Sequence, residues 1–154
     1  WDSLTELCLL YAARRDHWLK LIKPNLEQGI WVISDRFADS SIVYQGYAGD
    51  IELDTVLNIH NVVLGEVWPD LTIVLDLPPE LGLERSNKRD TANNSKDTRF
   101  EKRELPFHKL LREGFQYLQS KSPDRICVID GAKTIKEVEF EVFSVIQKRF
   151  VGLK

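Results

Sequence analysis

Residues 31–46 combine an apolar run with side chains that could bind phosphate, a divalent cation and a heterocyclic base. Val32 and Ile33 predict a buried strand, and Asp35 and Arg36 follow it directly. In parallel α/β sheets, ligands bind just beyond the carboxyl ends of the strands. A carboxylate at that place can serve a hydrated magnesium ion, and a guanidinium can hold a phosphate through two parallel hydrogen bonds.

The residues after this pair predict a short helix with a polar face. Ser41 and Gln45 are four residues apart, so they project from one side of a helix towards the same cavity. A hydroxyl and an amide suit the donor and acceptor edge of a nucleobase, although an ordinary polar helix face has the same composition. Tyr44 fits two positions equally well, beneath a sugar or base and in the core.

The whole run resembles the thymidylate kinase family. That family's pattern is Asp-Arg-aromatic, two variable residues, Ser-Ser, two variable residues and Tyr-Gln-Gly, and it is matched by Asp35, Arg36, Phe37, Ser40, Ser41, Tyr44, Gln45 and Gly46. An isolated Asp-Arg pair is more often a structural ion pair or a helix cap than a site. The full run with its spacing is far more specific.

The resemblance implies a reaction and a fold. The reaction is transfer of the γ-phosphoryl group of ATP to dTMP, giving dTDP, with Mg²⁺. The fold is a three-layer α/β P-loop kinase fold, with a parallel sheet that has helices on both faces. Family members are usually homodimers. Two alternatives stay open: a P-loop kinase for another pyrimidine nucleotide or nucleoside, and a non-catalytic chain that binds nucleotide or dimerises.

The resemblance also implies roles for residues on the acceptor side. Arg36 is expected to bind the acceptor phosphate and to act in catalysis, and Asp35 to hold Mg²⁺ through water. Arg14 stands where the family has an arginine that holds the acceptor nucleotide. Leu10 shares a helix face with Arg14, at the position where the family usually stacks a phenylalanine on thymine. Ser41, Tyr44 and Gln45 complete the expected substrate-binding set.

On the ATP side, the resemblance assigns a lid to residues 85–103. Arg99, which precedes an aromatic-acidic pair, is the expected catalytic lid arginine, and Arg85 and Arg89 are the next candidates. Basic side chains that close over the phosphates neutralise charge on the transferring group and exclude water. Residues 89–98 are polar and lack periodicity, which predicts a loop. Residues 130–133 fall where the family borders the adenine.

Composition narrows the class of protein further. The chain has 154 residues and a net charge of −3, which favours one domain, 1–154, and argues against a sequence-independent nucleic-acid binder. Cys8 and Cys127 lie in apolar surroundings without metal-ligand spacing, so we expect packed free thiols and a cytoplasmic setting. There is no secretory signal and no long apolar run, so membrane association is not expected.

Hydrophobic periodicity and helix-breaking residues define the expected elements. We expect strands over 30–34, 71–77 and 125–129. We expect a first helix that ends near Gly29, further helices over 38–46, 52–65, 78–88 and 100–120, and a last helix that begins at Thr134. The last helix is expected to bury Ile135, Val138, Val142, Val145 and Ile146. The first helix carries two apolar stripes, one through Leu4, Cys8, Tyr11, Arg15, Trp18 and Ile22 and the other through Leu7, Leu10, Arg14, His17 and Leu21. Two such stripes predict that this helix is covered on both sides, by the sheet and by a partner subunit.

The sequence contains no Gly-x-x-x-x-Gly-Lys-Ser/Thr motif. Phosphoryl-transfer enzymes of this type use that loop to hold the donor phosphates. We therefore expect an N-terminal segment, with the loop and the first strand, outside these 154 residues. That strand would lie between 30–34 and 71–77. Without the segment, we expect the chain to be inactive.

Overall fold

The structure of the chain is a computed structural model, which describes residues 1–93 and 105–150. The chain divides into two compact units, Trp1–Pro69 and Asp70–Lys154, and each is taken in turn. Among the described residues, no helix is long and apolar enough to cross a membrane.

The first unit begins with a long helical segment. It comprises α1 (Ser3–His17), the π-helix η1 (Trp18–Ile22) and α2 (Lys23–Glu27). Asp2 caps α1 by accepting a hydrogen bond from the Thr5 backbone N–H at 3.0 Å, which satisfies one of the free donors of the first turn. The segment ends at Gly29, as predicted, where φ is +74° and a residue without a Cβ is favoured.

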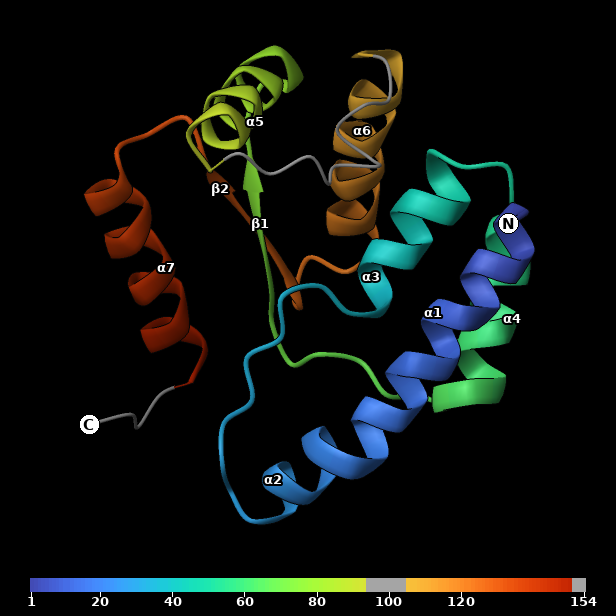
Figure 1. Cartoon of the computed structure of the whole chain (residues 1–154). Coiled ribbons are helices and arrows are strands. Elements are labelled where there is room, and N and C mark those ends of the chain that lie inside the picture. The colour runs from blue at the N-terminus through green and yellow to red at the C-terminus, as the bar shows by residue number, and fades with distance from the viewer. Residues whose placement is uncertain (94–104, 151–154) are drawn as a thin grey trace. The chain divides into compact units, whose positions relative to one another are not determined.

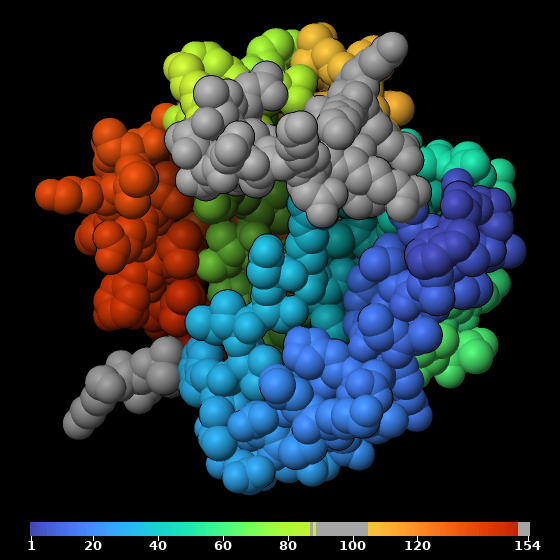
Figure 2. Space-filling model, in the orientation of Figure 1, coloured from blue at the N-terminus to red at the C-terminus, as the bar shows by residue number. Residues whose placement is uncertain are grey.

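The buried side of α1 cuts across both predicted stripes. Leu7 and Tyr11 are fully buried and Ile22 is nearly so, whereas Leu4 and Cys8 are exposed. Both cysteines are free, as expected, but the packed environment expected for Cys8 is wrong. Figure 1 shows α4 (Leu53–Leu64) lying along α1, which explains why only one side of α1 is covered within this unit. Figure 2 shows α1 and η1, in blue, at the surface.

Residues 30–34 do not form the predicted strand. They have no regular secondary structure, because a strand requires a hydrogen-bonded neighbour and, among the described residues, the only sheet has two strands, both in the second unit. The apolar run is therefore largely exposed, and Ile33 is 94% accessible.

The predicted helix over 38–46 is present in two parts, α3 (Ala38–Ser41) and the π-helix η2 (Ile42–Tyr47). The wide turn is visible in the hydrogen bond from the Ala48 backbone N–H to the Val43 carbonyl, at 2.8 Å. π-Helical turns occur frequently at functional sites. Gly46 allows η2 to approach α4 closely, since a Cβ at this position would lie 2.7 Å from Leu53 Cδ2.

The second unit contains the parallel sheet. Strand β1 (Thr72–Asp76) pairs in parallel with β2 (Ile126–Asp130), so that Asp76 is opposite Asp130 at the carboxyl end. The helices are α5 (Pro79–Asn93), α6 (Leu105–Lys121) and α7 (Ile135–Arg149). Figure 1 shows α6 and α7 on opposite sides of this sheet, and both contact β2. Two predicted strands and the layered arrangement of this unit are thus confirmed.

One predicted helix boundary and the predicted burial of α7 need correction. Helix α5 continues to Asn93 instead of ending near Lys88, because no glycine or proline interrupts residues 83–93, so that part of the predicted loop is helical. Helix α6 is described from Leu105, and the expected start near residue 100 lies outside the described residues. None of the five α7 residues predicted to be buried is buried: Ile135, in the first turn, is 87% exposed, and the other four, Val138, Val142, Val145 and Ile146, are half-buried.

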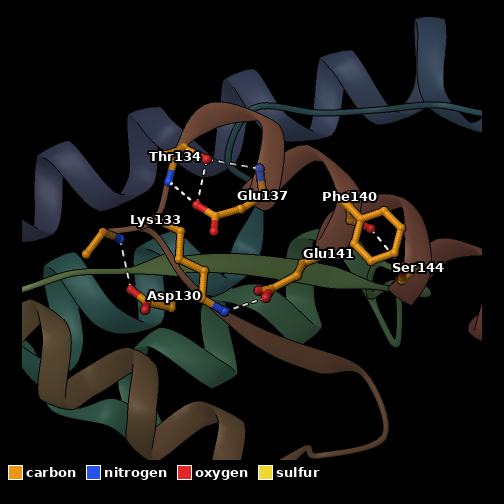
Figure 3. Close-up of polar contacts among 8 residues, drawn as sticks. Asp130, Lys133, Thr134, Glu137, Phe140, Glu141 and Ser144 are labelled. Carbon is orange, nitrogen blue, oxygen red and sulfur yellow. Dashed lines mark hydrogen bonds and ion pairs between the residues drawn. The ribbon is translucent and has the colours of Figure 1, made fainter.

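The turn between β2 and α7 is held by short-range polar contacts (Figure 3). Asp130 Oδ1 accepts a hydrogen bond from the Ala132 backbone N–H at 2.9 Å. The predicted capping box is present, because Thr134 Oγ1 accepts from the Glu137 backbone N–H while Glu137 Oε2 accepts from the Thr134 backbone N–H. Lys133 forms an ion pair with Glu141 one turn further along the helix.

Candidate functional site

Helix α1 and the α3–η2 segment bring two of the predicted substrate-binding residues into direct contact. Arg14 Nη2 donates a hydrogen bond to Ser41 Oγ at 3.2 Å. Ser41 is 1% exposed and Arg14 is half-buried. The sequence separates these residues by 27 positions, so the fold of this unit is what joins them.

The Arg14 guanidinium lies among aromatic rings. Its Cζ is 4.7 Å from the centroid of Tyr11 and 5.7 Å from that of Phe37, distances at which a cation is attracted to a ring. Burial lowers the pKa of Arg14 below its ordinary value, but an arginine stays charged. Its Nη1 is buried and bonds to no acceptor among the described residues. A buried donor without a partner is costly, which makes this nitrogen suited to an acceptor on a ligand.

Gln45 is also buried and also reaches α1. Its Nε2 donates to Glu6 Oε1 at 3.1 Å. Ser41 and Gln45 therefore both bond to side chains of α1. Leu10 is on the same helix and is 37% exposed. Tyr11, the nearest aromatic residue, points into the core, where its ring meets that of His60 edge-on.

Arg36 has an unusual backbone conformation. Its φ is +69°, and it is the only non-glycine residue with a positive φ within residues 1–93 and 105–150. Ser34 Oγ donates to the Arg36 carbonyl at 2.9 Å, and the guanidinium lies over the Tyr44 ring, 4.8 Å from its centroid. A non-glycine residue in this region is strained by about 1–2 kcal/mol, and such strain concentrates at functional sites.

Asp35 is exposed. In the part of the chain that the structure describes, Asp35 and Arg36 form no ion pair with each other, and α3 has no side-chain cap. These observations remove the structural alternatives for the pair. No group of three acidic, histidine or cysteine side chains gathers there either, again within the described residues. A lone exposed carboxylate still fits Mg²⁺, which keeps several waters and takes one or two carboxylates together with substrate phosphates.

One buried acid in this site was not predicted. Asp39 is 3% exposed. Burial raises the pKa of Tyr11 to about 12, and the charge of Asp39 adds to that rise. For Arg14, burial lowers the pKa and the charge of Asp39 partly opposes this. The family pattern treats this position as variable, so the motif gave it no weight. A carboxylate between serine-rich residues and an aromatic residue was the available signal.

In the second unit, Arg85 contacts protein backbone. Its Nη1 donates to the Gly131 carbonyl at 2.7 Å and its Nη2 to the Ala132 carbonyl at 3.3 Å. The arginine predicted for the ATP side therefore supports the turn after β2. Arg89 belongs to α5, but its side chain lies outside the described residues, as does the whole of Arg99.

A parallel sheet with helices on both sides, and a half-buried arginine bonded to a buried serine, are typical of an α/β protein of the nucleotide kinase class. The family model described as Thymidylate kinase matches residues 1–142. Thymidylate kinase of Caulobacter vibrioides is 41% identical over 149 residues, 97% of this chain and 69% of the relative. That of Nitrobacter winogradskyi is 42% identical over 145 residues, 94% of this chain and 62% of the relative.

A solved structure agrees with these sequence matches. The crystal structure of thymidylate kinase from Ehrlichia chaffeensis superposes with a TM-score of 0.72 at 33% identity, covering 96% of this chain and 66% of that one. The predicted α/β P-loop kinase fold is thereby confirmed. The chain belongs to the thymidylate kinase family. It spans about two thirds of the length of these relatives.

Proposed function

We propose that this chain forms the dTMP-binding part of an ATP-dependent thymidylate kinase, which converts dTMP to dTDP. The observation that carries the proposal is the arrangement around Arg14, whose buried Nη1 lacks an acceptor while Nη2 is fixed on Ser41. A pyrimidine carbonyl would supply that acceptor. Gln45 lies four residues after Ser41 in the α3–η2 segment and, like Ser41, bonds to α1. Leu10 of α1 offers an apolar surface for the base.

Arg36 is the proposed ligand of the dTMP phosphate. It is exposed, it forms no ion pair with any described residue, and its charge is always present. Its guanidinium can form two parallel hydrogen bonds with phosphate oxygens. Tyr44, beneath the guanidinium, orients it. The acceptor phosphate is already ionised near neutral pH, so no side chain has to remove a proton, and catalysis depends on position and charge.

Mg²⁺ would be held by Asp35 through water, together with the substrate phosphates. When bound, the ion neutralises charge on the transferring group. Asp35 directly precedes Arg36, so the residue proposed to hold Mg²⁺ and the residue proposed to bind the phosphate are neighbours in the chain.

The roles proposed on the ATP side concern Arg85, residues 85–103 and the turn 130–133. Arg85 is proposed to act by holding the turn 130–133, which would border the adenine. Lid roles for residues 85–103, with Arg89 and Arg99 on the ATP phosphates, rest on the family resemblance. The donor phosphate loop is absent from these 154 residues. We therefore propose that 1–154 is one kinase domain whose phosphoryl transfer needs a segment outside them.

A homodimer in the cytoplasm is the proposed working form. Large apolar side chains on α1 and η1 are between 44% and 48% exposed, namely Leu4, Leu9, Leu19 and Leu21. A second copy would cover this face, since apolar surface of this kind marks interaction sites. Sedimentation velocity should give twice the chain mass.

A coupled ADP-release assay with MgATP tests the reaction, using the 154-residue chain and the product of the complete gene with dTMP, dUMP or dCMP. We expect turnover only in the longer protein, with dTMP preferred. We also expect the 154-residue chain to bind dTMP. Folded protein that is silent in both forms and binds no dTMP would contradict the proposal and favour a structural role.

A further inference from the structure

Glu6 is a half-buried acid that the proposed reaction does not use. It lies on α1 two helical turns before Arg14, and its Oε1 accepts a hydrogen bond from Gln45 Nε2 at 3.1 Å. Gln45 itself is only 6% exposed. The contact joins positions 39 residues apart, so it reflects the fold of this unit.

The partner of an amide decides which way the amide points. An ionised carboxylate only accepts hydrogen bonds, so Gln45 must turn its NH₂ group towards Glu6 and its carbonyl away. The reversed amide would place two acceptor oxygens face to face. Within residues 1–93 and 105–150, no donor bonds to Gln45 Oε1, which leaves this oxygen available as an acceptor.

We infer that Glu6 is a positioning residue for base selectivity: by fixing the Gln45 amide, it presents an acceptor that matches the N3–H of thymine or uracil and repels the N3 lone pair of cytosine. This inference rests on the proposed function. Arg14 Nη1 adds a donor on the same helix, suited to a base carbonyl. The acceptor Gln45 Oε1 and the donor Arg14 Nη1 match the N3–H donor and carbonyl acceptor of thymine. Cytosine has an acceptor at N3 and an amino donor beside it, so both contacts would be repulsive.

Glu6→Gln is the direct test, because it keeps the shape of the side chain and removes its preference for a donor. Isothermal titration calorimetry on the full chain gives the ratio of dCMP to dTMP dissociation constants. We expect this ratio to fall by about tenfold in the variant, the value of one hydrogen bond, chiefly through tighter dCMP binding. Glu27→Gln is the matched control, since Glu27 pairs with Lys23 at 3.8 Å on the surface.

A second variant and a background test separate positioning from packing. Glu6→Asp keeps the charge but withdraws the carboxylate by one methylene, so the ratio of dCMP to dTMP dissociation constants should fall here too. If Glu6→Gln does not fold, Glu6→Asp is the variant that tests the inference. In a Gln45→Ala background, Glu6→Gln should leave the ratio unchanged, because no amide remains to be oriented.

The outcomes separate the inference from the proposed function. A wild-type chain that binds dTMP no better than dCMP would contradict the proposed function itself. A wild-type preference that persists in folded Glu6→Gln and Glu6→Asp would overturn only the role of Glu6. An equal loss of affinity for both nucleotides would likewise overturn it, since that result indicates a structural role alone.

Discussion

Arg112 and Asp76 form a two-point ion pair. Arg112 Nε donates to Asp76 Oδ1 at 2.7 Å and Nη2 donates to Oδ2 at 2.8 Å. The hydrogen bond to Asp76 raises the pKa of Arg112 above its ordinary value. Since Asp76 is the last residue of β1 and Arg112 is in the middle of α6, the pair fixes the helix on the strand end where ligands bind in parallel sheets.

Removal of this pair should weaken the second unit. We expect Arg112→Gln to lower the free energy of unfolding by about 1–2 kcal/mol, between the values for exposed and buried pairs, because Asp76 has a side chain only 20% exposed and would lose both donors. Urea unfolding measures the change. Lys109→Gln, which removes a single exposed contact with Glu80 at 3.4 Å, should cost much less than Arg112→Gln, because exposed ion pairs are screened by solvent. Equal effects would show that the two-point geometry contributes nothing.

Two substitutions of Arg36 should have the same effect on binding but different effects on stability, because its φ is positive. Both Arg36→Ala and Arg36→Gly remove the guanidinium, so both should lose most dTMP affinity in calorimetry and most kcat/KM in the complete enzyme. Only glycine removes the backbone strain, and Arg36→Gly should therefore be more stable than Arg36→Ala by about 1 kcal/mol. Near-normal kcat/KM in Arg36→Ala would refute the phosphate role. Equal stability of the two variants would contradict the strain.

Arg85 offers a test of support against direct phosphate binding. Arg85→Lys keeps the charge but cannot bond both carbonyls of the turn with the same planar geometry. If Arg85 acts through Gly131 and Ala132, we expect lysine and glutamine variants of the complete enzyme to raise the KM for ATP by a similar factor of about three to ten, with the KM for dTMP unchanged. Lys121→Gln serves as a control far along α6. Retention of the wild-type KM by Arg85→Lys alone would instead favour a phosphate contact.

Arg99 lies outside the described residues, so its prediction rests on the family resemblance. A lid arginine that acts mainly on the transition state contributes to turnover more than to substrate binding. Arg99→Ala should therefore lower kcat of the complete enzyme while the affinity for dTMP stays the same. An effect confined to the KM for dTMP would contradict this assignment.

Helix boundaries set by neighbouring residues were predicted well from the sequence. Features that depend on contacts between secondary-structure elements were predicted less well. Thr134 and Glu137 defined the start of α7, and Gly29 the end of the first helical segment, because caps and positive φ depend on neighbouring residues alone. The strand at 30–34 was wrong, because strand formation depends on a partner that no apolar run supplies by itself. The stripes of α1 failed for a related reason, since α4 covers one side only.

The same distinction applies to the site. Ser41 and Gln45 were found because a known motif and a four-residue spacing identify them. The contact with Glu6 on α1 depends on the approach of two helices, which spacing does not encode, so Glu6 was missed. The buried Asp39 was missed because it stands at a variable position of the motif. Arg112 was missed as well, since its role depends on a strand 36 residues away.

The capping box of α7 predicts a defined response to acid. Hydrogen bonds from Thr134 hold the pKa of Glu137 below its ordinary value of 4.5. A depressed pKa in the folded state stabilises the protein above the unfolded value, and this contribution is lost as the pH falls through the folded value. The difference in melting temperature between wild type and Glu137→Gln should thus be largest near neutral pH and should shrink below about pH 4.5. Glu139→Gln, on the same helix, is the control. A difference that stays constant down to about pH 3 would mean that the Glu137 charge does not contribute.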